Sequence, residues 1–94
     1  MNLREKIEKK LREIIDPEVG LDLVTLNTIE NLEVSDDGKV KVVFRPTTPF
    51  CPLGVQLALS IKKSLKEIEE VKEVEVEVID FIYAEQTNEL LKNV

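Results

Sequence analysis

The most reactive side chain in the sequence belongs to its single cysteine, Cys51, in the run Thr47-Thr48-Pro49-Phe50-Cys51-Pro52. This run joins a predicted strand to a predicted helix, and Pro52 stands where a missing backbone N–H costs little. We therefore expect Cys51 at or next to the helix N-cap, where free N–H groups and the helix dipole favour a thiolate. A thiolate is both a nucleophile and a soft metal ligand, so the pattern allows either chemistry.

The residues of this run also have structural interpretations. Thr47 and Thr48 could donate hydrogen bonds to the sulfur or to a bound group, although threonine also favours turns on its own account. Cys51 could be a small buried hydrophobe, because free cysteine is among the most often buried residue types. Phe50 is expected to anchor the core rather than to form a binding platform. The run by itself leaves both roles of Cys51 open.

Two carboxylates that flank Pro17 form a second candidate site. Asp16 and Glu18 lie in a short, stiff segment, and paired carboxylates can coordinate a metal or act as acid and base. The structural alternative is that Asp16 ends the first helix and that Glu18 is solvated, as such residues commonly are. The pair taken alone therefore favours the structural interpretation.

The absence of certain residue types and the net charge exclude several kinds of site and partner. The sequence has no histidine and one cysteine, which excludes His-dependent triads, zinc sites and an internal disulfide. Its 13 basic and 19 acidic residues give a net charge of −6, and this argues against nucleic acid as a partner, because phosphate-binding surfaces need clustered Lys and Arg. Frequent charges near the start leave no signal-peptide core and no membrane span there, so we expect a cytoplasmic protein without a membrane partner.

Hydrophobic periodicity predicts the elements that position these side chains. Apolar residues recur at helical spacing from Leu3 to Ile15, and Pro17 disfavours helical geometry just beyond. Residues 16–28 are expected to be a loop with some extended character. Strands are predicted for Ile29–Val34 and Lys39–Arg45, joined by a turn of sequence Ser-Asp-Asp-Gly.

The second half of the sequence continues this pattern. A second apolar stripe predicts a helix from about Pro52 to Ile68. Strict alternation of Glu and Val in Glu73–Val78 predicts a strand whose valines face the core and whose glutamates face the solvent. A short last helix is expected over Ala84–Lys92. Because a helix connects the second predicted strand to the third, the two are expected to run parallel.

Together these elements predict the fold class. A chain of 94 residues, 43% hydrophobic and 34% charged, fits one globular domain over residues 1–94. The order helix, hairpin, helix, strand predicts an α+β fold in which two helices pack on one face of a small mixed sheet.

Two of these motifs in this order carry a resemblance to a known family. Asp16-Pro17-Glu18-Val19-Gly20, then a hairpin, then the run around Cys51 resembles the iron-sulfur cluster assembly factor family of the SufT and PaaD type. The resemblance spans about residues 3–80 and includes the valine-rich segment 71–78. The family usually has Leu-Gly where this sequence has Leu26-Asn27, and asparagine can also adopt the left-handed conformation. Many members also end in a tryptophan- and proline-rich segment that residues 81–85 lack.

The resemblance implies a function and a set of site residues. It implies a non-enzymatic adaptor or carrier that works through Cys51, with Asp16 and Glu18 nearby, and whose partners are the iron-sulfur assembly machinery and recipient proteins. An iron-sulfur cluster is then a transient ligand; since clusters take about four thiolates, a homodimer, a partner or a small thiol must complete the site. The metal-ligand candidates are Cys51, Asp16 and Glu18, with Thr47 and Thr48 beside the bound group. Two alternatives are a thiol-based redox protein and an interaction module with a structural cysteine.

Overall fold

A three-stranded mixed sheet is the centre of the computed structural model, which describes residues 2–50 and 52–94. The strand order is β3 (Ile29–Val34), β4 (Lys39–Phe44), β5 (Glu73–Val78). Strands β3 and β4 form the predicted antiparallel hairpin, and β5 runs parallel to β4 after a helical crossover. The α+β fold with a small mixed sheet is therefore confirmed.

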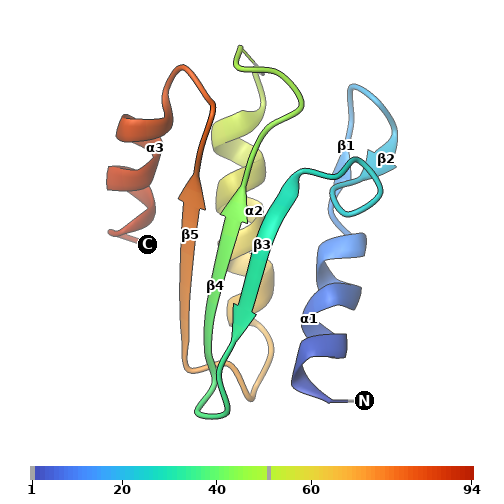
Figure 1. Cartoon of the computed structure of the whole chain (residues 1–94), viewed down its shortest axis with the longest axis vertical. Helices are drawn as coiled ribbons and strands as arrows, with labels where there is room; N and C mark the ends of the chain where they lie inside the picture. The colour runs from blue at the N-terminus through green and yellow to red at the C-terminus, as the bar shows by residue number, and fades with distance from the viewer. Residues whose placement is uncertain (1, 51) are drawn as a thin grey trace.

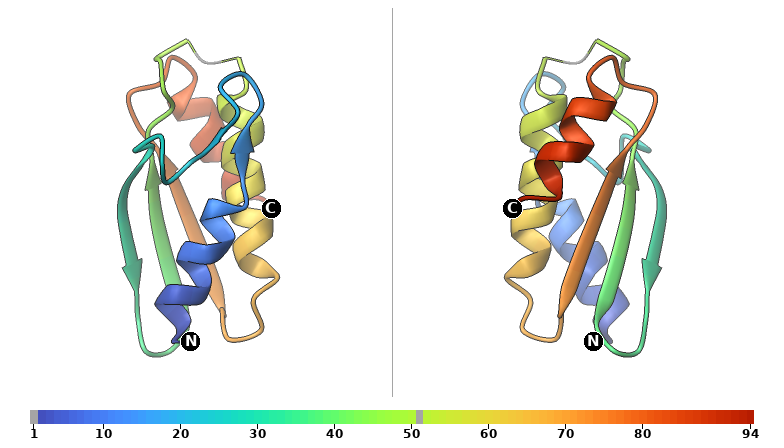
Figure 2. Two further views of the ribbon diagram at one scale, coloured as in Figure 1. Left: turned by 90° about the vertical axis from the view of Figure 1, so that its right-hand side faces the viewer. Right: turned by 90° about the vertical axis from the view of Figure 1, so that its left-hand side faces the viewer.

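One face of this sheet carries all three helices, α1 (Leu3–Arg12), α2 (Gly54–Lys66) and α3 (Ala84–Leu91), as Figure 2 shows. The expected short last helix is thus present beside the two predicted ones. The other face is open, and it carries the glutamates of β5. The valines of β5 alternate with these glutamates and face the helices, as predicted.

The core lies between the sheet and the helices. Its fully buried members come from every layer, and they include Ile7, Leu11, Leu23, Val42, Phe44, Ile61 and Leu65. Asn2 caps α1, since its side chain accepts a hydrogen bond from the Glu5 amide at 2.8 Å. These contacts hold α1 and α2 against one face of the sheet. The loops that follow β4 and β5 extend past the ends of these strands (Figure 1).

The first helix is shorter than predicted. It ends at Arg12, not near Ile15, and Ile15–Asp16 instead forms β1, which pairs antiparallel with β2 (Leu21–Asp22). Pro17 disfavours helical geometry before it, and Gly20 turns the chain back with φ +81°. Ile14 therefore stays in the core, while Ile15, expected on the buried stripe, is exposed.

The second helix also differs from prediction at both ends. It begins at Gly54 with Leu53 as its N-cap, and it ends at Lys66 instead of Ile68. At Leu53 the backbone (φ −102°, ψ 6°) is outside the helical region, so Pro52 belongs to the preceding turn. Phe81 packs on Gly54 so closely that a Cβ there would lie 2.8 Å from its ring. This close approach explains why a glycine opens the helix.

Candidate functional site

Three connections meet at one end of the sheet, which we call the loop end. They are the β1–β2 hairpin (15–22), the segment between β4 and α2 (45–53) and the segment between β5 and α3 (79–83). Figures 1 and 2 place all three at the end where β4 and β5 finish. The described candidates, Asp16 and Glu18 from the first half of the sequence and Thr47 and Thr48 from the middle, therefore come from the same end of the molecule.

The segment that contains Cys51 is exposed on its N-terminal side. Thr47, Thr48 and Pro49 are exposed, and Pro49 accepts a hydrogen bond through its carbonyl from the Ile82 amide at 2.9 Å. Cys51 itself lies outside the described residues, so the prediction of an exposed, acidic thiol stays a prediction. The N-cap is Leu53, so Cys51 precedes it by two positions and does not adjoin it, contrary to expectation. The influence of the helix dipole falls off within about one turn, so this part of the argument for a low pKa is weaker.

Phe50 was expected in the core, and that prediction is wrong. Its side chain is 72% exposed, whereas Phe81 from the neighbouring segment is buried and contacts Tyr83 edge-to-face at 5.8 Å. Phe81 fills the space above Gly54 at the start of α2, so it takes the anchoring role. A sequence pattern cannot easily separate the two, because both phenylalanines stand in loops beside prolines or turn residues.

Asp16 and Glu18 occupy very different environments. Asp16 is 1% exposed; its Oδ1 accepts the Glu18 amide at 2.9 Å, and its carbonyl accepts the Gly20 amide at 2.7 Å. Glu18 is exposed. Within residues 2–50 and 52–94, no group of three or more acidic or cysteine side chains is arranged to hold a metal. Asp16 thus shapes the hairpin turn, and metal binding by this pair remains a prediction.

A hollow of about 600 Å³ lies beside the same segment. Thr47 lines it together with Asn27, Arg45 and Asp80. The Arg45 guanidinium bonds Glu30 at 2.6 Å and lies 3.8 Å from the Asp80 carboxylate, so its charge is largely compensated. Asn27 (φ 58°) confirms the expected left-handed residue, and Asp80 (φ 51°) is a second one that sequence reasoning missed. Among residues other than glycine, asparagine and aspartate are enriched in this conformation, which is the signal that could have found it.

Large apolar side chains surround the loop end. Those exposed there are Ile15, Val19 and Leu21 from the hairpin, Phe50 from the central segment, and Ile82 and Tyr83 from the last segment. Exposed large apolar side chains that gather at one end of a fold commonly mark a protein contact. Among the described residues, no helix is long and apolar enough to cross a membrane.

Comparison with known proteins agrees with this arrangement. The chain is 32% identical over 82% of its length to the Fe-S protein maturation auxiliary factor YitW of Bacillus subtilis, of which it covers 76%. It is 37% identical over 80% of its length to an iron-sulfur cluster carrier protein of Deinococcus radiodurans, of which it covers 21%. A crystal structure of a DUF59 domain from Bacillus anthracis superposes with a TM-score of 0.75, at 29% identity over 82% of this chain and 74% of that one.

The family match spans most of the fold described above. Residues 4–78, from α1 to the end of β5, match the family described as iron-sulfur cluster assembly protein. This range contains the buried Asp16 turn and the segment around Cys51, the two motifs that carried the resemblance in the sequence. With both motifs at the loop end of a matching fold, the chain belongs to the iron-sulfur cluster assembly protein family.

Proposed function

We propose that this chain is a non-enzymatic adaptor or carrier that assists iron-sulfur cluster assembly and passes clusters to recipient proteins through Cys51. The similarity to a maturation auxiliary factor and to part of a cluster carrier supports this role. The observation that carries it is the exposed apolar surface on both sides of the Cys51 segment. A donor must dock on its recipient for the time of transfer, and such a surface provides the docking area.

The number of available ligands limits how a cluster is carried. Iron-sulfur clusters take about four thiolate ligands, whereas this chain has one cysteine and no histidine. The cluster is therefore cargo shared between Cys51 and ligands from a second chain, a partner or a small thiol. Shared, solvent-facing ligation favours release, which suits a donor.

Asp16, Glu18, Thr47 and Thr48 have supporting roles in this proposal. The buried Asp16 side chain fixes the turn of the β1–β2 hairpin, which carries three of the exposed apolar side chains. Glu18 is exposed on that turn and is free to complete the coordination of iron. Thr47 and Thr48 are exposed directly before Cys51 and can donate hydrogen bonds to a bound sulfide.

Replacement of Cys51 tests the role of the thiol. Cys51→Ser and Cys51→Ala should both abolish support of iron-sulfur enzyme activity in cells that depend on this protein. The free energy of unfolding of each variant should stay within about 1 kcal/mol of the wild-type value. A structural cysteine gives the opposite pattern. Alanine would then preserve function, and serine, an unpaired hydroxyl in an apolar site, would destabilise the fold.

Anaerobic reconstitution with iron and sulfide tests the carriage of a cluster. We expect at most one labile cluster per two chains, measured by iron and sulfide analysis together with native mass spectrometry. A stable cluster on a monomer without added thiol contradicts the shared site. Absence of iron uptake under every condition excludes the carrier and leaves an adaptor that recruits the machinery.

A further inference from the structure

Strand β5 has a backbone edge that faces away from β4. The Ile79 amide donates to the Phe44 carbonyl at 3.0 Å, so the odd-numbered residues direct their backbone groups to β4. Backbone groups alternate in direction along a strand, so those of Val74, Val76 and Val78 point to the opposite side. Asn88 of α3 occupies this side at Val78, accepting its N–H at 2.8 Å and donating to its C=O at 3.1 Å.

The edge is free in the first part of the strand. Among the hydrogen bonds of residues 2–50 and 52–94, none reaches the outward N–H or C=O of Val74 or Val76. Figure 1 shows α3 beside the C-terminal part of β5 and ending before its N-terminal part. The side chain of Asn88 therefore imitates a neighbouring strand at one residue, and the outward backbone groups of Val74 and Val76 have no such partner among the described hydrogen bonds.

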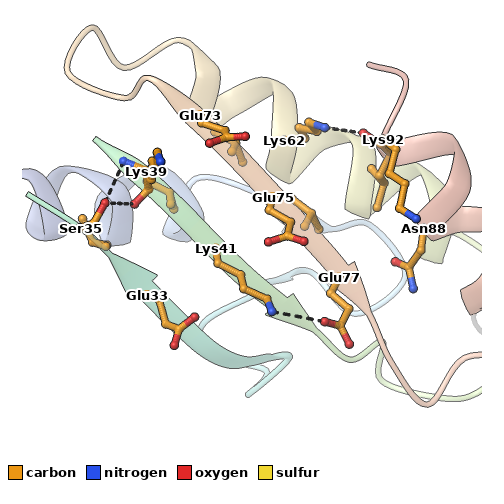
Figure 3. A pocket seen from close by; sticks show the side chains of 15 residues that line it. Glu33, Ser35, Lys39, Lys41, Lys62, Glu73, Glu75, Glu77, Asn88 and Lys92 are labelled. Carbon is orange, nitrogen blue, oxygen red and sulfur yellow. Dashed lines mark hydrogen bonds and ion pairs between the residues drawn. The ribbon is translucent and has the colours of Figure 1, made fainter. Parts of the chain in front are cut away.

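A hollow of about 860 Å³ lies over the open face of the sheet, where Glu33, Lys39 and Lys41 line it, and extends to this edge. Its lining includes Glu73, Glu75 and Glu77 from β5 and Lys62, Asn88 and Leu91 from the helices. In Figure 3 the three glutamates stand on the open face, and Lys62 lies on the helix side, where its ammonium group donates to the Leu91 carbonyl. The two sides of the edge thus differ: the open-face side has the carboxylates of β5, and the helix side has an engaged lysine beside a leucine.

Charge alternates across the open face of the sheet. The pairing register places Glu33 of β3 opposite Lys41 of β4, and Lys41 opposite Glu75 of β5. Lys41 also lies 3.6 Å from the Glu77 carboxylate, and Lys39 is opposite Glu73. The order is negative, positive, negative, and opposite charges on neighbouring strands stabilise a sheet. A strand that paired with the free edge of β5 would continue this alternation if its side chains on the open face were basic.

A second copy of this chain does not fit the edge through the same strand. Two β5 strands paired antiparallel about Glu75 would set Glu73 opposite Glu77 and Glu75 opposite itself. Like charges directly opposite one another destabilise strand pairing. Charged edge strands commonly protect proteins from self-association in this way, but the same charges attract a strand of opposite sign.

We infer that the free edge of β5, Glu73–Val76, binds an extended segment of a partner protein in which Lys or Arg alternates with apolar residues. The segment adds a fourth strand to the sheet: its basic side chains face Glu73, Glu75 and Glu77, and its apolar side chains face Leu91 and the aliphatic part of Lys62. Backbone pairing supplies recognition at Val74 and Val76, and side-chain charge supplies specificity. Asn88 ends the site at Val78.

A titration of isotope-labelled protein with an end-blocked peptide of alternating Lys and Val, followed by NMR, tests this inference. The amides of Val74 and Val76 should shift and exchange more slowly, while an alternating Glu and Val peptide should not bind. Glu75→Lys should weaken binding of the basic peptide about tenfold, as expected for reversal of a complementary charge. Glu33→Lys is the matched control, because it makes the same charge change on the far strand of the same row, and it should change affinity less than about twofold.

Backbone pairing is tested separately from charge. Two further peptides carry N-methyl groups, one on the lysines and the other on the valines, and one of the two should lose binding because its edge-facing N–H groups are blocked. Equal binding of both methylated peptides, equal weakening by Glu33→Lys, or absence of binding overturns the inference. Protection of Val74 and Val76 that rises with protein concentration without peptide also overturns it, since a second copy then occupies the edge.

Discussion

The two ends of the sheet expose opposite kinds of surface. At the loop end, six large apolar side chains are exposed around the segment that contains Cys51. The other end, which we call the turn end, consists of the β3–β4 turn (35–38) and the connection from α2 to β5 (67–72). There Lys6 and Lys10 of α1 pair with Glu70 and Glu67. The remaining exposed large apolar residues of the described chain, Leu90 and Val94, are on α3 and at the C-terminus.

Packing around the two left-handed glycines also differs between the ends. At the turn end, Gly38 lies under the α2–β5 connection, and its carbonyl accepts the Lys72 amide at 2.8 Å. At the loop end, Gly20 has a similar backbone angle, but nothing lies within 4 Å of the position of a Cβ. The comparison indicates that the turn at Gly38 is packed against the α2–β5 connection, whereas the hairpin turn at Gly20 is open; at the loop end the close packing lies between Phe81 and Gly54.

The largest expected effect is on stability at the turn end. Gly38 and Gly20 have φ of +87° and +81°, so alanine at either position adopts a left-handed conformation that costs about 1 kcal/mol. At Gly38 the new Cβ would also lie 2.5 Å from the Glu70 carbonyl oxygen, which cannot move without displacing the connection. We expect Gly38→Ala to lower the free energy of unfolding by about 3 kcal/mol and Gly20→Ala by about 1 kcal/mol.

Urea unfolding measures both glycine variants under the same conditions. Gly20→Ala is the matched control, because it isolates the cost of the backbone angle from that of the close contact. Equal losses for the two variants would show that the turn end is no more tightly packed than the loop end.

A smaller effect is expected when apolar surface is removed at the loop end. Phe50→Ser truncates a 72% exposed side chain next to Cys51, so the free energy of unfolding should change by less than about 0.5 kcal/mol. If recipients dock there, transfer of a cluster should slow about tenfold, because exposed aromatic residues often dominate a contact. Leu90→Ser on α3 is the control, and it should leave both quantities unchanged. Equal slowing of transfer by the two variants would show that recipients do not dock specifically on the apolar side chains of the loop end.

The sequence predicted the regular part of the molecule well, because regular elements bury one face and periodicity reports that face. The bounds of β3 and β5 are correct; the alternation of Glu73–Val78 predicted its buried side, and the helical connection predicted that it runs parallel to β4. Errors gather at the loop end. Ile15 continued the apolar stripe of α1, yet Pro17 and Gly20 turn the chain into a hairpin there, so tertiary context overrode the helical pattern.

Prediction of the site was limited by the same cause. The grouping of Asp16 with Cys51 rests on the order of two family motifs, and it stays a prediction because Cys51 lies outside the described residues. The exposure of Phe50 and the free edge of β5 could not be predicted, because each depends on contacts between segments that are separated in the sequence, whereas the residue type of Asp80 was an overlooked signal of its left-handed conformation. Asn88, for example, stands ten residues after Val78, and nothing in its neighbours indicates that it caps a strand.

The smallest expected effect is on the pH dependence of the free energy of unfolding. Its physical cause differs between the two ends. At the loop end, a hydrogen bond from the Thr25 hydroxyl lowers the pKa of Asp22, and at the turn end a bond from Lys6 lowers the pKa of Glu70. A carboxyl whose pKa is lower in the folded state stabilises the fold above its unfolded-state pKa, about 4, and this contribution is lost as the pH falls through the folded-state pKa. In urea unfolding from pH 7 downwards, Asp22→Asn and Glu70→Gln should therefore differ most from the wild type near neutrality and converge with it in acid.

Added salt should shrink the effect of Glu70→Gln, because Glu70 belongs to an exposed ion pair. It should leave the effect of Asp22→Asn unchanged, since the partners of Asp22 are a hydroxyl and backbone amides. Equal salt dependence of the two variants would contradict this assignment of polar bonding to one end and ion pairing to the other.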